Sequence, residues 1–419
     1  MRVGIVGAGP AGLSAAKHAT IQGLSCTVFE QSSSLGGTWV YTDKVGHDEY
    51  GLPIHTSMYR DLRVNIPKEI VHYPDFPHKA NTRSYITSEE VLKYLNDFAD
   101  FYNLRKYIQL KHYVMKIRRK NNCWSMRVID LPNKQEIELE FDAIFVCNGL
   151  NNKPEYPTLK GMTRFKGKSL HSHDYRNPAS FQGETVLVIG GGPSAVDIAF
   201  QVANTALKVI LSHHSSHFKN IKFQSNVFEM PDVMEIKDDS VIFEDNRVEY
   251  IDSIIYCTGY VSNYPFLHES CGITVEDKYV FPLYKHFINA YHPTMCILGN
   301  LCKSMQFPTF DLQVRFFLKS LTHDILPSTE EMLNNINDYV RKKDFSKKTF
   351  FITTSEEDAA YYTDLARSAN IEPVPKVMIN IFCRAAETLF GNYPDFRKDN
   401  YKIIDSESFE LTSLEAIDC

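Results

Sequence analysis

Two glycine-rich segments of the same form constrain the fold of this chain more than any other feature. Residues 2–12 and residues 185–195 each join a short run of aliphatic residues to closely spaced glycines, and an alanine-rich stretch follows each of them. A strand, a glycine turn and a helix in this order begin a βαβ nucleotide-binding unit. Because a long stretch of chain separates the two units, we predict an α/β protein with two doubly wound, Rossmann-like domains.

The segments around these units indicate how the domains are connected. The predicted elements are a helix over 87–102, strands over 113–117, 124–130 and 136–140, buried strands over 142–149 and 252–259, and helical packing of the aromatic residues over 307–317. No third glycine fingerprint follows residue 260. We therefore expect a first domain over 1–165, a second domain inserted over 166–260, and a return to the first domain over 261–419. That last segment should contain helices and end in a frayed polar tail over 402–419.

The glycines of the first unit have the spacing that a dinucleotide needs. Gly7 permits a tight turn after the strand, Gly9 lets the backbone approach a pyrophosphate, and Gly12 lets the helix pack closely on the sheet. Glu30 ends the next strand, where a carboxylate binds ribose hydroxyls and repels a 2′-phosphate. We therefore predict FAD or NAD here, against the alternative of a turn that serves packing alone. The residues expected to contact the dinucleotide are Gly7, Gly9, Pro10, Ala11, Gly12, Glu30 and Gln31.

The second unit lacks an acidic residue at the end of its second strand. Ser212, His213 and His214 stand there instead, and Lys219 and Lys222 follow. Hydroxyl, imidazole and ammonium groups accommodate a 2′-phosphate better than a carboxylate does. We therefore favour NADPH over NADH at this unit, with exposed loop histidines as the alternative interpretation. The turn residues expected to contact the nucleotide are Gly190, Gly192, Pro193, Ser194 and Ala195.

Composition narrows the partners and the location. The nine cysteines form no C-x-x-C pair and no cluster with zinc-ligand spacing, so we expect free thiols and no metal. The net charge of −6 gives no bulk attraction for nucleic acid, and no run of about 18 apolar residues predicts a membrane span. We expect a cytoplasmic protein, with secretion as the alternative if a leader precedes Met1. A homo-oligomer is compatible with the sequence.

Several short motifs resemble those of the flavin-containing monooxygenase family. They are Phe165-x-Gly167-x-x-x-His171-x-x-x-Tyr175 just before the second fingerprint, residues 59–69 followed by Asp75-Phe76-Pro77, Cys257-Thr258-Gly259-Tyr260 with cysteine where the family has alanine, and the stretches 282–287 and 292–293. These motifs follow one another in the family's order. The resemblance favours the shorter members without a membrane tail, among them insect enzymes that N-oxidise plant alkaloids.

The resemblance implies a catalytic cycle and the residues that serve it. NADPH would reduce FAD, O2 would add to the flavin C4a, and the resulting hydroperoxide would oxidise the substrate while NADP+ shields it. The family's conserved asparagine corresponds to Asn65, a neutral amide that donates and accepts without acting as an acid. A plain turn residue before Pro67 is the alternative, and His171 would orient the linker between domains. Further residues expected near the cofactors are Gly37, Thr38, Trp39, Arg63, Val64, Val114, Tyr175, and Gln306 or Gln313.

The expected reaction is oxygenation of a soft nucleophile, a tertiary amine or a sulfide, with a pyrrolizidine-type plant alkaloid as one candidate. A Baeyer–Villiger monooxygenase would use the same cofactors on a ketone, but its motif usually ends in Trp or in a residue followed by Pro or Asp, whereas Arg176 follows Tyr175. A disulfide oxidoreductase would share the two fingerprints, but it needs a redox C-x-x-C pair, and this chain has none. A flavin-binding sensor or scaffold without turnover would share both fingerprints, and stopped-flow absorbance would distinguish it.

Overall fold

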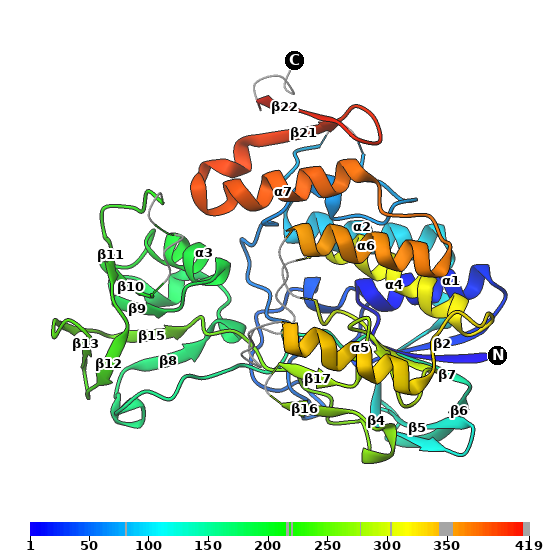
Figure 1. Ribbon diagram of the computed structural model, residues 1–419. Helices are drawn as coiled ribbons and strands as arrows, with labels where there is room; N and C mark the ends of the chain where they lie inside the picture. Colours follow the sequence, from blue (N-terminus) through cyan, green and yellow to red (C-terminus); the bar gives the residue numbers. More distant parts are fainter. Residues whose placement is uncertain are drawn as a thin grey trace.

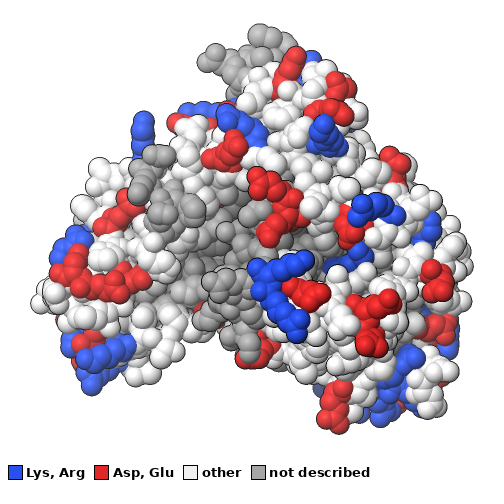
Figure 2. Space-filling view, viewed as in Figure 1, with Lys and Arg blue, Asp and Glu red and all other residues white. Residues whose placement is uncertain are grey.

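The chain folds into two lobes, each built around its own sheet, which is mainly parallel in the larger lobe and entirely parallel in the smaller (Figure 1). The computed structural model describes residues 1–79, 82–214, 218, 221–276, 278–301, 304–342 and 355–413. Figure 2 shows the surface hollowed between the lobes, with acidic and basic side chains intermixed on the face viewed. The larger lobe contains both ends of the described chain, so the smaller lobe is an insertion.

The strand order confirms two doubly wound domains, one inserted into the other. The larger sheet runs β18 (Leu283–Tyr284), β19 (Ile288–Asn289), β20 (Met295–Ile297), β7 (Ala143–Val146), β1 (Arg2–Val6), β2 (Ser25–Glu30) and β3 (Ile108–Leu110). The smaller sheet runs β11 (Val227–Met230), β10 (Lys208–Ser212), β9 (Thr185–Ile189), β15 (Ser253–Tyr256) and β8 (Lys168–His171), and all of its strand pairs are parallel. Every strand of the smaller sheet lies between β7 and β18 in the sequence.

Alternating side chains give the larger sheet two apolar faces. Ile5 and Phe145 contribute to one hydrophobic cluster, whereas Val6 and Ile144 contribute to another on the opposite face. The helices are α1 (Pro10–Ile21), α2 (Ser88–Phe101), α3 (Pro193–Val202), α4 (Gln306–Ser320), α5 (Thr329–Lys342), α6 (Ser355–Ala369) and α7 (Lys376–Gly391). In Figure 1, α1, α2, α4 and α6 lie on one side of this sheet, and α3 lies with the smaller sheet.

The remaining strands form small antiparallel layers. They are β4 (His112–Lys120), β5 (Cys123–Asp130) and β6 (Gln135–Phe141), then β12 (Val233–Ile236), β13 (Ser240–Phe243) and β14 (Val248–Tyr250), then β16 (Thr274–Glu276) with β17 (Tyr279–Phe281), and β21 (Asp399–Ile403) with β22 (Phe409–Ser413). Strands β4 to β6 include the three strands predicted between the two units, and α4 includes the predicted aromatic helix. The predicted start of α2 is also confirmed, because Thr87 and Glu90 form a reciprocal capping box.

The prediction of a frayed tail over 402–419 is wrong for the part that the structure describes. Strands β21 and β22 form a hairpin in which Tyr401 packs on Phe409, with ring centroids 5.5 Å apart. Ser84 holds this hairpin to the larger lobe, because its N–H donates to Asn400 Oδ1 at 3.0 Å and its hydroxyl accepts from Tyr401 N–H at 2.8 Å. The polar composition concealed the hairpin, since its stability comes from a partner segment far away in the sequence.

Two further expectations concern the cysteines and the membrane. The seven cysteines within the described residues are all free thiols, as predicted. In the described part of the chain, no helix combines the length and the apolarity that crossing a bilayer requires.

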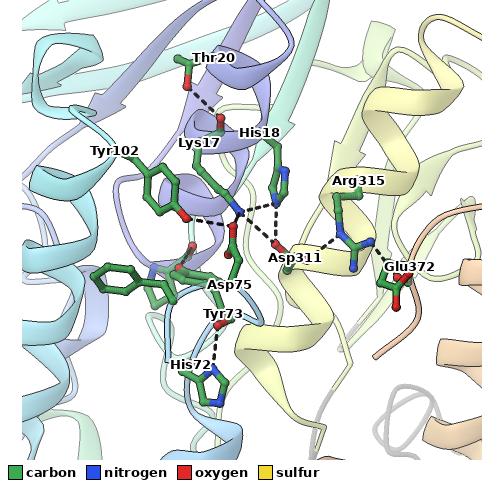
Figure 3. Close-up of polar contacts among 12 residues, drawn as sticks. Lys17, His18, Thr20, His72, Tyr73, Asp75, Tyr102, Asp311, Arg315 and Glu372 are labelled. Carbon is green, nitrogen blue, oxygen red and sulfur yellow. Dashed lines mark hydrogen bonds and ion pairs between the residues drawn. The ribbon is translucent and has the colours of Figure 1, made fainter. Parts of the chain in front are cut away.

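A cluster of charges, buried except for the half-exposed Asp75, joins α1 to α4 and to the loop before α2 (Figure 3). Lys17 of α1 forms an ion pair with Asp75, whose carboxylate also accepts from the Tyr102 hydroxyl at 2.9 Å. Asp311 of α4 accepts from His18 Nε2 at 2.5 Å. Asp75, which belongs to a motif shared with the resembled family, therefore has a structural role: it holds its loop against the helix of the first glycine turn.

We expect Asp311→Asn to destabilise the fold by about 3 kcal/mol near neutral pH, because it leaves buried cations without their partner. Burial alone would raise the pKa of Asp311, but the hydrogen bond from His18 and the nearby cations lower it from 3.8 to about 2. A carboxyl with a lowered folded-state pKa stabilises the fold above its unfolded pKa, and this stability is lost as the pH falls toward the folded value.

Urea unfolding of wild type and variant, from neutral pH to about pH 2.5, measures this difference. The difference in the free energy of unfolding between the two proteins should decrease by about 2 kcal/mol as the pH falls. Asp97→Asn, which breaks an exposed ion pair on α2, serves as the control and should change stability little. A difference in the free energy of unfolding that stays constant with pH would contradict the role of Asp311.

Candidate functional site

Backbone crowding explains the glycines of the first turn. Gly7 has a φ of +97°, and a Cβ there would lie 2.5 Å from the carbonyl oxygen of Cys147. A Cβ on Gly12 would lie 1.9 Å from the carbonyl oxygen of Gly7. Helix α1 begins at Pro10, and no side chain caps its N-terminus at Gly9. The first N–H groups of α1 therefore remain open to an anionic ligand such as a diphosphate.

Glu30 is buried at the end of β2, beside the same turn. Its Oε2 accepts from Ala8 N–H at 2.8 Å, and its Oε1 accepts from Ser32 N–H at 2.9 Å. These bonds orient the carboxylate, and each oxygen keeps a further acceptor position for a ribose hydroxyl. Gln31 follows directly and is half-buried. A carboxylate held in this place suits FAD and repels a 2′-phosphate.

The loop after Glu30 folds back onto the turn. The Gly36 N–H donates to the turn backbone at 3.0 Å. Gly37 has a φ of +58°, and a Cβ there would lie 3.0 Å from the Cα of Gly9, so a glycine at position 37 favours this close approach of the two backbones. Thr38 and Trp39 follow and are half-buried. The structure thus brings the predicted loop and the predicted turn into contact.

The second turn repeats the first in its backbone. Gly190 has a φ of +146°, and a Cβ there would lie 2.3 Å from the carbonyl oxygen of Cys257. Gly192 differs from Gly9, because a Cβ built on Gly192 meets no atom within 4 Å. Ala195 is fully buried at the position where the first turn has Gly12. Helix α3 begins with no side-chain cap, and the exposed residues of this turn are Gly191, Pro193 and Ser194.

The residues after β10 have partners that the sequence did not indicate. The Ser212 hydroxyl is buried and donates to a backbone carbonyl at 2.8 Å, so it does not face a nucleotide. His213 Nε2 lies 3.0 Å from Glu229, and His214 Nδ1 lies 2.9 Å from Asp232. Of the three predicted residues, His214 exposes the most of its side chain. These two carboxylates orient the imidazoles, and their negative charge makes the surroundings less favourable for a 2′-phosphate than the sequence indicated.

Asn65 lies in a loop that neighbouring backbone holds in place. The Val64 N–H donates to the carbonyl of Ile86 at 3.0 Å, and Arg63 forms a bridge with Thr87. The Asn65 side chain accepts a hydrogen bond at its Oδ1, and no described residue accepts one from its Nδ2. The loop is therefore rigid at its backbone, while one end of the Asn65 amide remains available to a ligand.

Several other predicted residues pack in the core or form hydrogen bonds to other groups of the protein. The Tyr175 ring is buried against Tyr59, with centroids 5.4 Å apart, and its hydroxyl donates to Gln201. The Val114 side chain belongs to the core beneath the sheet. The Gln306 amide donates to backbone at 2.8 Å. The Gln313 amide donates to the Tyr361 hydroxyl. Lys219, which was expected near the nucleotide, lies outside the described residues.

His171 fits the positioning role that was expected of it. Its ring is fully buried, and its Nδ1 accepts from the N–H of His173 at 3.1 Å at the end of β8. Burial, and to a smaller extent the neighbouring His173, lower the pKa of His171 to about 4. A neutral imidazole that accepts from its own turn is consistent with the predicted role in orienting the linker, which stays a prediction.

Two charged residues near Asn65 were missed by the sequence analysis. Arg397, which follows α7, donates through Nη2 to Asn65 Oδ1 at 2.8 Å and through Nη1 to Asp197 at 3.0 Å. Asp197 lies on α3, so it comes from the inserted lobe. An acidic residue within an apolar helix was the available signal for Asp197, whereas no motif indicated Arg397.

Comparison with known proteins decides the family. A model described as flavin-binding monooxygenase-like matches residues 1–219 and 217–396. The chain belongs to this family. Senecionine N-oxygenase of Tyria jacobaeae is 35% identical over 98% of this chain and 91% of its own length. Two solved structures share the fold with TM-scores of 0.88: S-allyl-L-cysteine S-oxygenase from Allium sativum, 29% identical over 95% of each chain, and Tmm from Pelagibacter sp. strain HTCC7211, 26% identical over 98% of this chain and 96% of its own.

Membership of this family confirms the predicted cofactors. The protein is a flavin-dependent monooxygenase that uses FAD and NADPH. The residues present fit two such groups, because both glycine turns end in an uncapped helix N-terminus and only the first unit has a buried carboxylate, Glu30, at the end of its next strand. Individual contacts to either nucleotide are predictions from this geometry.

We expect Gly12→Ala to abolish FAD retention, because the added methyl group would overlap the carbonyl of Gly7 and displace α1 from the turn. Gly192→Ala is the matched change in the second turn, where a methyl group meets open space. This variant should keep its flavin but bind NADPH more weakly, since the methyl group obstructs an approaching diphosphate.

The flavin absorbance of the purified proteins and the KM for NADPH measure the two effects. Equal flavin content in wild type and Gly12→Ala would contradict the assignment of the first turn. An unchanged KM in Gly192→Ala would contradict that of the second.

Proposed function

We propose that this monooxygenase transfers one oxygen atom from O2 to a soft nucleophile, a tertiary amine or a sulfide, and releases the N-oxide or S-oxide. The other oxygen atom leaves as water, with NADPH and a proton supplying the electrons and hydrogen. The likeness of almost the whole chain to an N-oxygenase and an S-oxygenase supports this proposal most. No acid–base or nucleophile pair is required of the protein, because FAD supplies the oxygen chemistry when bound.

The contribution of this chain is to bind, orient and shield. The first turn and Glu30 would hold FAD, and the second turn with His213 and His214 would hold NADPH. Asn65 would present its amide N–H group to the reacting region. A neutral donor in that place stabilises charge without supplying the proton that turns bound oxygen into free H2O2.

A nitrogen or sulfur substrate fits better than a ketone. Of the similar proteins, senecionine N-oxygenase oxidises a nitrogen atom and S-allyl-L-cysteine S-oxygenase a sulfur atom. The Baeyer–Villiger alternative is therefore not favoured. A pyrrolizidine-type alkaloid is the substrate class to test first, because the N-oxygenase relative matches almost the whole chain.

The domain limits and cellular setting belong to the same proposal. We place the FAD-binding domain at 1–165 and 261–419 and the NADPH-binding domain at 166–260, in line with the strand order of the two sheets. A cytoplasmic location fits the free thiols of the described residues. The substrate is a small molecule, and a homo-oligomer is compatible with the fold.

NADPH oxidation with a panel of amines, sulfides, alkaloids and ketones tests the proposal. We expect formation of N-oxide or S-oxide to account for most of the NADPH consumed, with little H2O2, and NADH to be a poorer reductant. Measuring product and H2O2 in the same reaction separates oxygenation from simple oxidase activity. Ketone turnover without amine or sulfide turnover would favour the Baeyer–Villiger alternative.

We expect Asn65→Asp to raise the H2O2 released per NADPH severalfold, because it replaces a neutral donor with an ionisable acceptor. Asn121→Asp adds the same charge at an exposed turn between β4 and β5 and serves as the control. The readout is the ratio of H2O2 to oxygenated product at saturating substrate. The same ratio in both variants would remove Asn65 from its proposed role.

A further inference from the structure

A buried carboxylate of the inserted lobe is bound by residues of the larger lobe. Asp197 lies on α3, and 7% of its side chain is exposed. It accepts hydrogen bonds from the hydroxyl of Tyr59 at 2.6 Å, from the hydroxyl of Tyr393 at 2.5 Å and from Arg397 Nη1 at 3.0 Å. None of these three donors lies within the inserted segment. These contacts of the carboxylate therefore hold α3 in one position relative to the larger lobe.

Arg397 extends this cluster to Asn65. One nitrogen of its guanidinium binds Asp197, and the other donates to Asn65 Oδ1 at 2.8 Å. Burial has the largest single effect on the pKa of Arg397 and lowers it, but the charges and hydrogen bonds of Asp197 and Tyr393 together outweigh burial, so the pKa is raised. The side chain is therefore a permanent cation, and its planar fork holds the acid and the amide at a fixed separation.

This contact determines which end of the Asn65 amide is free. A guanidinium has only donors, so the atom facing it must be the amide oxygen. The Nδ2 group is then directed away from Arg397 and can act as a donor to a ligand. Without Arg397, the amide could rotate and present its oxygen instead, since the oxygen and NH2 ends are similar in size.

We propose that Arg397 is a positioning residue for oxygenation: it orients the Asn65 amide and makes that orientation depend on the docking of α3 through Asp197. The proposal rests on the role of Asn65 stated above. Arg397 lies one residue beyond the segment that matches the family model. Its backbone is anchored by the neighbouring hairpin, in which Asn400 accepts from the N–H of Ser84.

If the proposal is correct, loss of Arg397 should reduce the efficiency of oxygen transfer more than it reduces cofactor binding. Removal of the guanidinium should leave both glycine turns intact, because neither turn contacts it. We therefore expect the FAD content and the KM for NADPH to stay near their wild-type values, while the ratio of H2O2 to product rises at least about threefold.

Two variants and one control separate positioning from stability. Arg397→Met removes both hydrogen bonds, whereas Arg397→Lys keeps a cation for Asp197 but loses the fork that also reaches Asn65. Arg384→Met, which breaks an exposed ion pair on α7, is the control. The H2O2-to-product ratio, the melting temperature and the flavin content are measured for each. We expect Arg397→Lys to melt closer to wild type than Arg397→Met and still to release excess H2O2.

A double-mutant cycle identifies the route of the effect. If Arg397 acts through Asn65, then Asn65→Ala combined with Arg397→Lys should release no more H2O2 than Asn65→Ala alone. Additive effects of the two changes would overturn the proposal, as would a wild-type ratio in Arg397→Lys at full flavin content. A different result would contradict the proposed function itself: wild-type protein that forms no oxygenated product, or Asn65→Asp without excess H2O2.

Discussion

The whole arrangement depends on two places where the main chain passes closer to a neighbouring strand than any side chain allows. At Gly7 and at Gly190, a Cβ would lie within 2.5 Å of a carbonyl oxygen. Those oxygens belong to Cys147 and Cys257, which follow β7 and β15. Each crossing directs the chain into a helix whose N-terminus has no side-chain cap. The same geometry thus produces the two sheets, their helices and the two sites for anionic cofactors.

The two turns differ in ways that suit them to different nucleotides. The first turn is covered by the loop at Gly37 and bordered by the Glu30 carboxylate. The second turn is open around Gly192 and has no acidic residue at the end of β10. A covered turn suits a cofactor that stays bound, and an open turn suits one that enters and leaves during each reaction cycle.

Features set by local chemistry could be predicted from the sequence. The glycine turns, the acidic residue, the capping box at Thr87 and the insertion all follow from short-range patterns, and the structure contains them. Long-range contacts could not be predicted in this way. The Ser212 hydroxyl turns toward backbone, the Tyr175 ring enters the core, and the C-terminal hairpin forms against Ser84. Each of these depends on a partner that is distant in sequence, and polarity alone does not identify such partners.

The position of Arg397 near the end of the chain has a consequence for synthesis. The bond between Arg397 and Asn65 joins residues 332 positions apart. Both glycine turns leave the ribosome long before Arg397 is made. The first turn can therefore form before the side chain that binds the Asn65 amide exists. The segment with Arg397, which directly precedes the β21–β22 hairpin, therefore completes the contacts of Asn65 only late in synthesis.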